Sequence, residues 1–89
     1  MVSEEITIIN KLGLHARAAA KFVNVASRFG STVKVIRGEK EVDGKSIMSV
    51  MMLAAAQGSL LILNISGEDE KLALDALKEL IDNRFDEEE

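Results

Sequence analysis

Residues 13–20 of the chain read Gly-Leu-His-Ala-Arg-Ala-Ala-Ala, and at this stretch the spacing of the apolar residues changes. Before it, apolar and polar residues alternate over residues 6–8, as in a half-buried strand. After it, apolar residues recur at the intervals of a helix face, at Ala19, Phe22, Val23, Ala26 and Phe29. Gly30 then offers a left-handed end for that helix. The stretch therefore predicts a strand, a loop and a helix that begins at about Ala16.

The same two patterns account for the rest of the chain. Further strands are expected over residues 33–35, around 40–42, and over the continuous β-rich run 60–65. One helix is expected after Ser46, and another is expected to carry the acidic residues 68–70 in its first turn, where the helix dipole favours them. The order β-α-β-β-α-β-α, with apolar stripes that suggest one shared face, predicts an α+β fold. We expect a two-layer open-faced sandwich of a four-stranded, mainly antiparallel sheet with three helices on one face.

Length and composition indicate one small domain over residues 1–89. The hydrophobic fraction of 47% is enough for a core, and the absence of cysteine excludes disulfide and thiol chemistry. A small domain without disulfides fits a reducing cytoplasm, and residues 1–5 lack the features of a signal peptide. The longest apolar run, 50–56, is far shorter than the about 20 residues that cross a bilayer. We expect a cytoplasmic protein that spans no membrane.

Charge is distributed unevenly along the chain. The formal net charge of −4 argues against a protein that binds nucleic acid by neutralising phosphates. A module that stacks RNA bases on its sheet is also disfavoured, because the three phenylalanines, the only aromatic residues, lie at helical positions. The acidic residues 86–89 are expected to form a frayed, solvated end of the domain, to which no function is assigned.

His15 is the only histidine, and it lies where the first helix begins. The first N–H groups of a helix have no intrahelical partners, so those of Ala16, Arg17 and Ala18 are expected to bind an anion beside the ring. The guanidinium of Arg17 can bind phosphate oxygens in a bidentate manner. The helix terminus and this arginine also favour a neutral, nucleophilic imidazole. Together these features predict a histidine that accepts a phosphoryl group.

A histidine can also serve in a metal site or in a Ser-His-Asp catalytic triad. A metal site is disfavoured, because zinc needs three or four ligands and the chain has neither cysteine nor a second histidine. A Ser-His-Asp triad stays open on spacing alone, although the chain contains no G-x-S-x-G elbow and is small for a substrate pocket. We therefore expect neither a metal nor a cofactor.

Ser46 stands directly before the apolar run 47–53, which is the position of a helix N-cap. Phosphorylation there would add a charge of about −1.5 to −2 at a helix start without unfolding the domain. Such a group would repel an acidic partner.

The run 47–53 contains more methionine than a short helix buries easily. We expect Val50 or Met52 to enter the core, and Met48 and Met51 to be exposed near His15. An exposed methionine surface ringed by positive charge would suit several partners with acidic rims.

Two stretches, 13–19 (Gly-Leu-His-Ala-Arg-Ala-Ala) and 44–51 (Gly-Lys-Ser-Ile-Met-Ser-Val-Met), closely resemble the HPr family. These are the histidine-containing phosphocarrier proteins of the bacterial phosphoenolpyruvate-dependent sugar phosphotransferase system, and the likeness runs from Glu5 to about Phe85. The resemblance implies that His15 accepts a phosphoryl group on Nδ1 from phosphorylated Enzyme I and donates it to Enzyme IIA domains. Arg17 would stabilise the phosphate carried on His15. The protein would then be a carrier and not an enzyme, and we expect it to be a monomer.

The resemblance also implies regulation and a docking surface. Ser46 matches the residue that the HPr kinase/phosphorylase modifies, which weakens docking of Enzyme I. In some bacteria the modified form is a corepressor for a catabolite control transcription factor. By similarity, the residues that dock partners are Ala16, Ala20, Asn24, Ile47, Met48 and Met51.

One residue departs from the family's usual pattern, because Ala18 stands where proline is usual and the chain contains no proline. Loss of proline is expected to loosen the first helical turn and to alter rate or stability, with phosphotransfer retained. A rival hypothesis is a regulatory variant in which Ser46 phosphorylation matters and sugar transport is absent. Neither the sugar nor the permease partner follows from the sequence.

Overall fold

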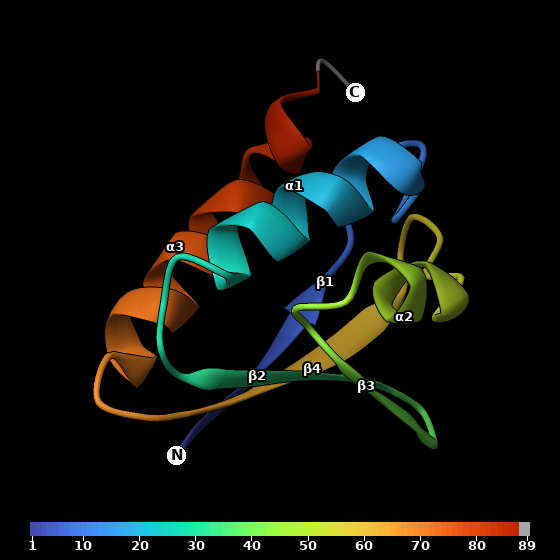
Figure 1. Cartoon of the computed structure of the whole chain (residues 1–89). Helices are drawn as coiled ribbons and strands as arrows, with labels where there is room; N and C mark the ends of the chain where they lie inside the picture. The colour runs from blue at the N-terminus through green and yellow to red at the C-terminus, as the bar shows by residue number, and fades with distance from the viewer. Residues whose placement is uncertain (88–89) are drawn as a thin grey trace.

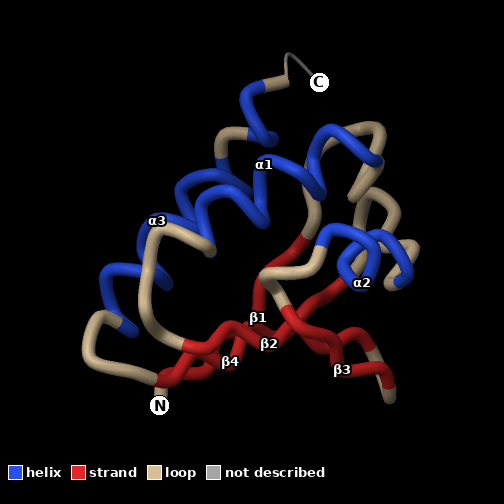
Figure 2. The backbone as a smooth tube through the Cα atoms, in the orientation of Figure 1, coloured by secondary structure: helices blue, strands red, loops and turns tan. Residues whose placement is uncertain are grey.

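A computed structural model describes residues 1–87 of the chain, as a four-stranded antiparallel sheet and three α-helices (Figure 1). The elements follow the expected order. They are β1 (Val2–Thr7), α1 (Ala16–Ala26), β2 (Thr32–Arg37), β3 (Lys40–Asp43), α2 (Ile47–Met52), β4 (Leu60–Ser66), α3 (Glu70–Asp82) and the 3-10 turn η1 (Arg84–Asp86). The strand order is β1-β4-β2-β3, and Figure 2 shows α1, α2 and α3 on the same side of the sheet. The predicted α+β open-faced sandwich is confirmed.

Strand β4 is the centre of the sheet, because it pairs with both β1 and β2. Its residues alternate between the two faces, so the inward set on β4 is buried under the helices: Leu61, Leu63 and Ile65. Leu60 and Ile62 point to the open face and are exposed. The β-rich run 60–65 is thus a central strand with one buried face.

Each long helix contributes a narrow apolar stripe to the core. The buried residues of α1 are Ala18, Ala19, Phe22, Val23 and Ala26, and those of α3 are Ala73, Leu77 and Ile81. Within residues 1–87, no helix is both long enough and apolar enough to cross a bilayer.

The expected left-handed helix end at Gly30 is wrong. Helix α1 ends at Ala26, Ser27 keeps a right-handed φ of −73°, and Gly30 is not among the residues with positive φ. The backbone N–H of Gly30 instead donates to the Asp69 carboxylate at 2.9 Å. A contact with α3, which local sequence does not reveal, fixes this turn.

Asp69 connects the start of α3 to the turn that leads into β2. Its carboxylate accepts hydrogen bonds from the backbone N–H groups of Gly30 and Ser31 and from the Ser31 hydroxyl. The Ser31 hydroxyl first, and then the Gly30 amide, hold the pKa of Asp69 below its ordinary value of 3.8. The bonds favour the ionised carboxyl group in the folded state, so they stabilise the fold wherever that group is ionised.

Replacement of Asp69 by asparagine is expected to destabilise the fold in a pH-dependent way. Because the folded pKa is depressed, the contribution of Asp69 is present above the unfolded pKa of about 3.8 and is lost as pH falls through the lower folded value. Urea unfolding should show Asp69→Asn less stable than the wild type at pH 7, with a difference that shrinks below pH of about 4. Glu68→Gln, at an exposed acidic residue next in the chain, is the control. A difference that stays constant down to pH of about 2 would contradict this role.

Candidate functional site

The loop before α1 is fixed by a close approach to the loop after α2. Gly13 has φ +67°, and a Cβ atom there would lie 2.5 Å from the carbonyl oxygen of Ala55. Leu14 donates its backbone N–H to the same oxygen at 2.9 Å. The fully buried Asn10 donates from Nδ2 to the carbonyl of Gly13 at 2.8 Å. Only glycine meets both the backbone and the steric requirement at position 13, and the loop it permits sets where α1 begins.

His15 is the N-cap residue of α1, but its side chain makes no capping hydrogen bond. Its carbonyl accepts the N–H of Ala19 at 2.8 Å, which is the first bond of the helix. The side chain is 28% exposed, and its Nε2 lies 2.9 Å from Oε2 of Glu87. No hydrogen bond reaches Nδ1 from any residue in the range 1–87. The ring is therefore held through Nε2, while Nδ1 is without a partner among these residues.

Three backbone N–H groups precede the first helical bond, and they belong to Ala16, Arg17 and Ala18. None of them has an acceptor in the described part of the chain. Together with the positive end of the helix dipole, such N–H groups are suited to bind an anion directly after His15. The structure thus brings the histidine and the amides together as predicted.

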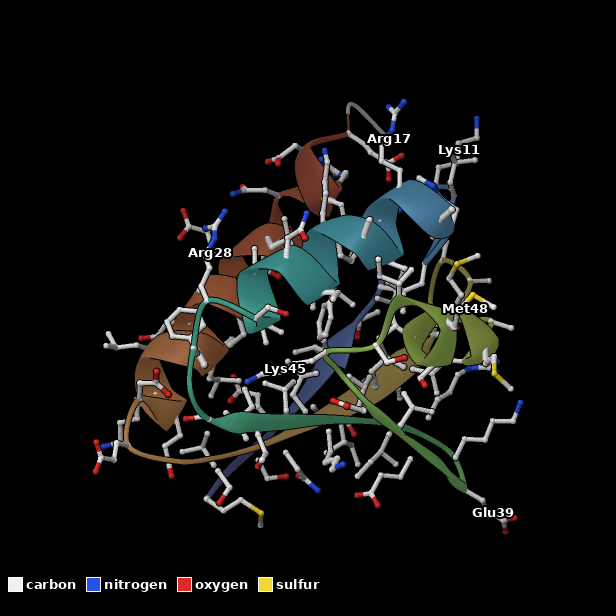
Figure 3. The ribbon with its side chains drawn as sticks, in the orientation of Figure 1. Lys11, Arg17, Arg28, Glu39, Lys45 and Met48 are labelled. Carbon is white, nitrogen blue, oxygen red and sulfur yellow. The ribbon has the colours of Figure 1, made fainter. Side chains whose placement is uncertain are left out.

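Arg17 lies in the first turn of α1 and is exposed. Figure 3 shows its side chain extending outward from the helix. It forms no ion pair with any residue of the range 1–87. The guanidinium is close to the helix start in sequence and is not engaged in the fold, so it is available to an incoming anion.

Ser46 is the N-cap of α2, as its position in the sequence predicted. Its hydroxyl accepts the N–H of Ser49 at 3.3 Å, and its carbonyl accepts the N–H of Val50 at 3.0 Å. The residue is half-buried. The capping role is confirmed, while phosphorylation of Ser46 stays a prediction.

Helix α2 presents an apolar surface next to the start of α1, against which it packs. Val50 is the residue that enters the core, whereas Met52 is exposed. Ile47 (41%), Met48 (70%) and Met51 (37%) are also exposed, and Figure 3 shows Met48 on the outside of α2. The predicted docking residues of α1, Ala16, Ala20 and Asn24, are exposed or half-buried. We call these six residues the docking surface: Ala16, Ala20, Asn24, Ile47, Met48 and Met51.

Leu12 extends the apolar character beyond the docking surface. It is 67% exposed in the loop before α1, and sequence reasoning missed it. A leucine beside Gly13, outside both the strand and the helix patterns, was the available signal.

The C-terminal segment differs from the expected frayed end at Asp86 and Glu87. Asp86 belongs to the turn η1, and Glu87 contacts His15 and also accepts a hydrogen bond from Asn10 Nδ2 at 2.7 Å. The physical reason is the full burial of Phe85, which anchors the chain after α3. Residues 88 and 89 lie outside the described residues. Neither Asn10 nor Glu87 was expected at the site from the sequence.

Comparisons with known proteins agree on one family. The family model described as "PTS HPr component phosphorylation site" matches residues 2–83. Phosphocarrier protein HPr of Pseudomonas aeruginosa is 66% identical over 88 residues, which cover 98% of each chain. The crystal structure of HPr-C-His from Thermoanaerobacter tengcongensis is 46% identical and covers 100% of both chains, with a TM-score of 0.96. Crh, the catabolite repression containing protein of Bacillus subtilis, is 40% identical, with a TM-score of 0.75 over 94% of this chain and 97% of that one. It forms a dimer with a swapped domain.

A methyl group at position 13 is expected to destabilise the site. Gly13→Ala adds left-handed strain and forces the Cβ against the Ala55 carbonyl, whereas Gly38→Ala, at φ +60° with nothing within 4 Å, adds the strain alone. Strain costs about 1–3 kcal/mol at either position. Displacement of packed backbone should cost Gly13→Ala about 1–3 kcal/mol more, measured by urea unfolding. Equal losses in the two variants would show that the close approach does not constrain the loop.

Proposed function

The chain belongs to the HPr family of phosphocarrier proteins, which are carriers and not catalytic enzymes, and we propose that His15 is its phosphoryl acceptor. Phosphorylated Enzyme I would supply the group, and Enzyme IIA domains would receive it. The observation that carries the proposal is the position of the ring at the start of α1, directly before three amides without acceptors in residues 1–87. A nucleophile and an anion site are adjacent there.

Transfer is an in-line displacement. The lone pair of Nδ1 attacks phosphorus, the new N–P bond forms, and the bond between phosphorus and the donor breaks. The helix-start amides and the guanidinium of Arg17 bind the phosphoryl oxygens, where negative charge concentrates. Binding of the donor protein would supply the alignment, since the side chain of His15 is partly exposed at the surface.

The docking surface would receive Enzyme I and Enzyme IIA domains. Its exposed methionines are flexible and polarizable, so one surface can fit partners of different shape. Arg17 lies beside it and would steer partners whose rims are acidic. We expect such partners to use the same residues for both steps of the relay, because the phosphoryl group stays on one side chain.

Ser46 would be the regulatory site, modified by the HPr kinase/phosphorylase. Its hydroxyl lies at the start of α2 beside the apolar residues Ile47 and Met48. A phosphoryl group there would place negative charge next to the docking surface and repel an acidic Enzyme I. The likeness to Crh supports a second role, in which the modified protein binds a catabolite control transcription factor.

We assign the active carrier to the cytoplasm, where it would reach its partners by diffusion. We also propose that it acts as a monomer. The described site draws all its residues from one chain: His15, the α1 amides, Arg17, Asn10 and Glu87. A second copy is therefore not required to complete it. No nucleic acid or membrane enters the proposed function.

Phosphorylation by Enzyme I tests the acceptor directly. The purified chain, incubated with Enzyme I and labelled phosphoenolpyruvate, is expected to acquire acid-labile, base-stable phosphate. The His15→Ala variant should acquire none, because it lacks the ring nitrogen. Absence of label on the wild type with an active cognate Enzyme I would overturn the proposal.

Charge at position 46 is expected to slow that reaction. Asp and Asn are both good N-caps, so Ser46→Asp and Ser46→Asn should fold equally well and differ mainly in charge. Ser46→Asp should lower kcat/KM for phosphorylation by Enzyme I about tenfold, equivalent to about 1.4 kcal/mol of repulsion, and added salt should reduce the effect. Ser46→Asn should stay near the wild type. A similar loss in both variants would mean that shape, and not charge, governs docking.

A further inference from the structure

We infer that Glu87 is a positioning residue for His15: its carboxylate keeps the ring proton on Nε2 and thereby leaves the lone pair of Nδ1 free to accept the phosphoryl group. The inference rests on the proposed function of His15 as the acceptor. It concerns a C-terminal residue that lies far from the histidine in sequence and beside it in the fold.

The two carboxylate oxygens of Glu87 have different partners. Oε1 accepts from Nδ2 of Asn10 at 2.7 Å, and Oε2 lies 2.9 Å from Nε2 of His15. An ionised carboxylate can only accept hydrogen bonds, so Nε2 must be the donor and carry the proton. A neutral imidazole has one N–H, and its other nitrogen then holds a lone pair. The contact with Glu87 therefore selects the tautomer that is nucleophilic at Nδ1.

Asn10 fixes the direction of the carboxylate. Its side chain is fully buried, and Nδ2 donates both to Glu87 and to the carbonyl of Gly13. The same amide group thus joins the C-terminal segment to the loop that places His15. Oε1 of Glu87 cannot move away without leaving a buried N–H of Asn10 without this acceptor.

The chain after α3 is shaped to bring Glu87 to this place. Arg84, Phe85 and Asp86 have φ values of 56°, 55° and 64°, which is the left-handed region that residues other than glycine rarely adopt. Phe85 is fully buried, and Lys21 donates from Nζ to its carbonyl at 2.8 Å. Figure 1 shows this segment, in red, beside α1. Three successive strained residues persist only where packing holds them, so the position of Glu87 is built into the fold.

A carboxylate near a phosphoryl site could instead act as a blocker that occupies the anion site. The contacts favour positioning. Glu87 touches Nε2 and Asn10, and no hydrogen bond joins it to the amides of residues 16–18. No hydrogen bond from residues 1–87 occupies the helix start, and the carboxylate lies against Nε2, the ring nitrogen opposite the proposed acceptor Nδ1.

The same contact assists the transfer step. As the lone pair of Nδ1 forms the bond to phosphorus and the donor's bond breaks, the ring gains a positive charge while its proton stays on Nε2. The carboxylate of Glu87 lies beside that N–H and balances the charge as it develops. No further reactant is required.

The tautomer of His15 can be measured without any transfer reaction. In the unphosphorylated full chain, at a pH where titration shows the ring to be neutral, ¹⁵N NMR should find the proton on Nε2. Glu87→Ala should shift the ring toward a mixture of tautomers. Asp82→Asn, which removes an exposed acidic group at the end of α3, should leave it unchanged. Wild-type protein with its proton on Nδ1, or an unchanged tautomer in Glu87→Ala, would overturn the inference.

Kinetics of phosphorylation by Enzyme I then test the consequence. Glu87→Ala should lower kcat about tenfold, which is the size of effect seen when a histidine that binds a metal loses the residue that orients it. KM should change little, because the docking surface is intact. Glu87→Gln keeps the shape of the side chain but has only one oxygen, so it cannot accept hydrogen bonds from both Asn10 and His15 through oxygen. Its kcat should therefore lie between those of the wild type and Glu87→Ala. Faster transfer in Glu87→Ala would identify a blocker, and an equal loss in Asp82→Asn would identify a general charge effect; either overturns the inference. If no variant accepts phosphate on His15, the proposed function fails, while the NMR result still decides the tautomer.

Discussion

The close approach of Gly13 to the carbonyl of Ala55 is the constraint on which the functional end of the molecule depends. It joins the loop before α1 to the loop after α2, two segments far apart in the chain, through backbone atoms and the hydrogen bond from Leu14. Because the two helices are fixed relative to each other in this way, the anion site at the start of α1 and the apolar residues of α2 lie on one surface. The proposed phosphoryl acceptor and the proposed docking surface thereby lie side by side.

The fold could be predicted from the sequence because its elements carry local signals. Period-two alternation marks β1 and β2, period-3.6 stripes mark α1 and α3, and a run of β-forming residues marks the central strand β4. His15 and Ser46 could be found for the same reason, since each lies at a helix start that its neighbours define. Residues that act through local backbone geometry are visible in a single sequence.

Asn10 and Glu87 could not be predicted, because their importance comes only from tertiary contacts. An asparagine in a loop and a glutamate in an acidic run have no periodic signal, and here they meet each other and His15. The left-handed turn that carries Glu87 contains no glycine or asparagine to indicate it. Its cause is the burial of Phe85, which depends on the space left between α1 and α3. The end of α1 at Ala26 has a similar origin, since Asp69 from α3 fixes the turn that follows.

Ala18 stands where the resemblance to the family led us to expect proline, and it can add a donor to the proposed anion site. It is the third residue of α1, fully buried, and its N–H is one of the three amides that precede the first helical bond. A proline there would supply no N–H, so alanine gives the anion site a donor that the usual residue lacks. The cost is a more flexible unfolded chain, typically about 0.4–1 kcal/mol of stability. The added amide would favour a phosphoryl group bound at His15.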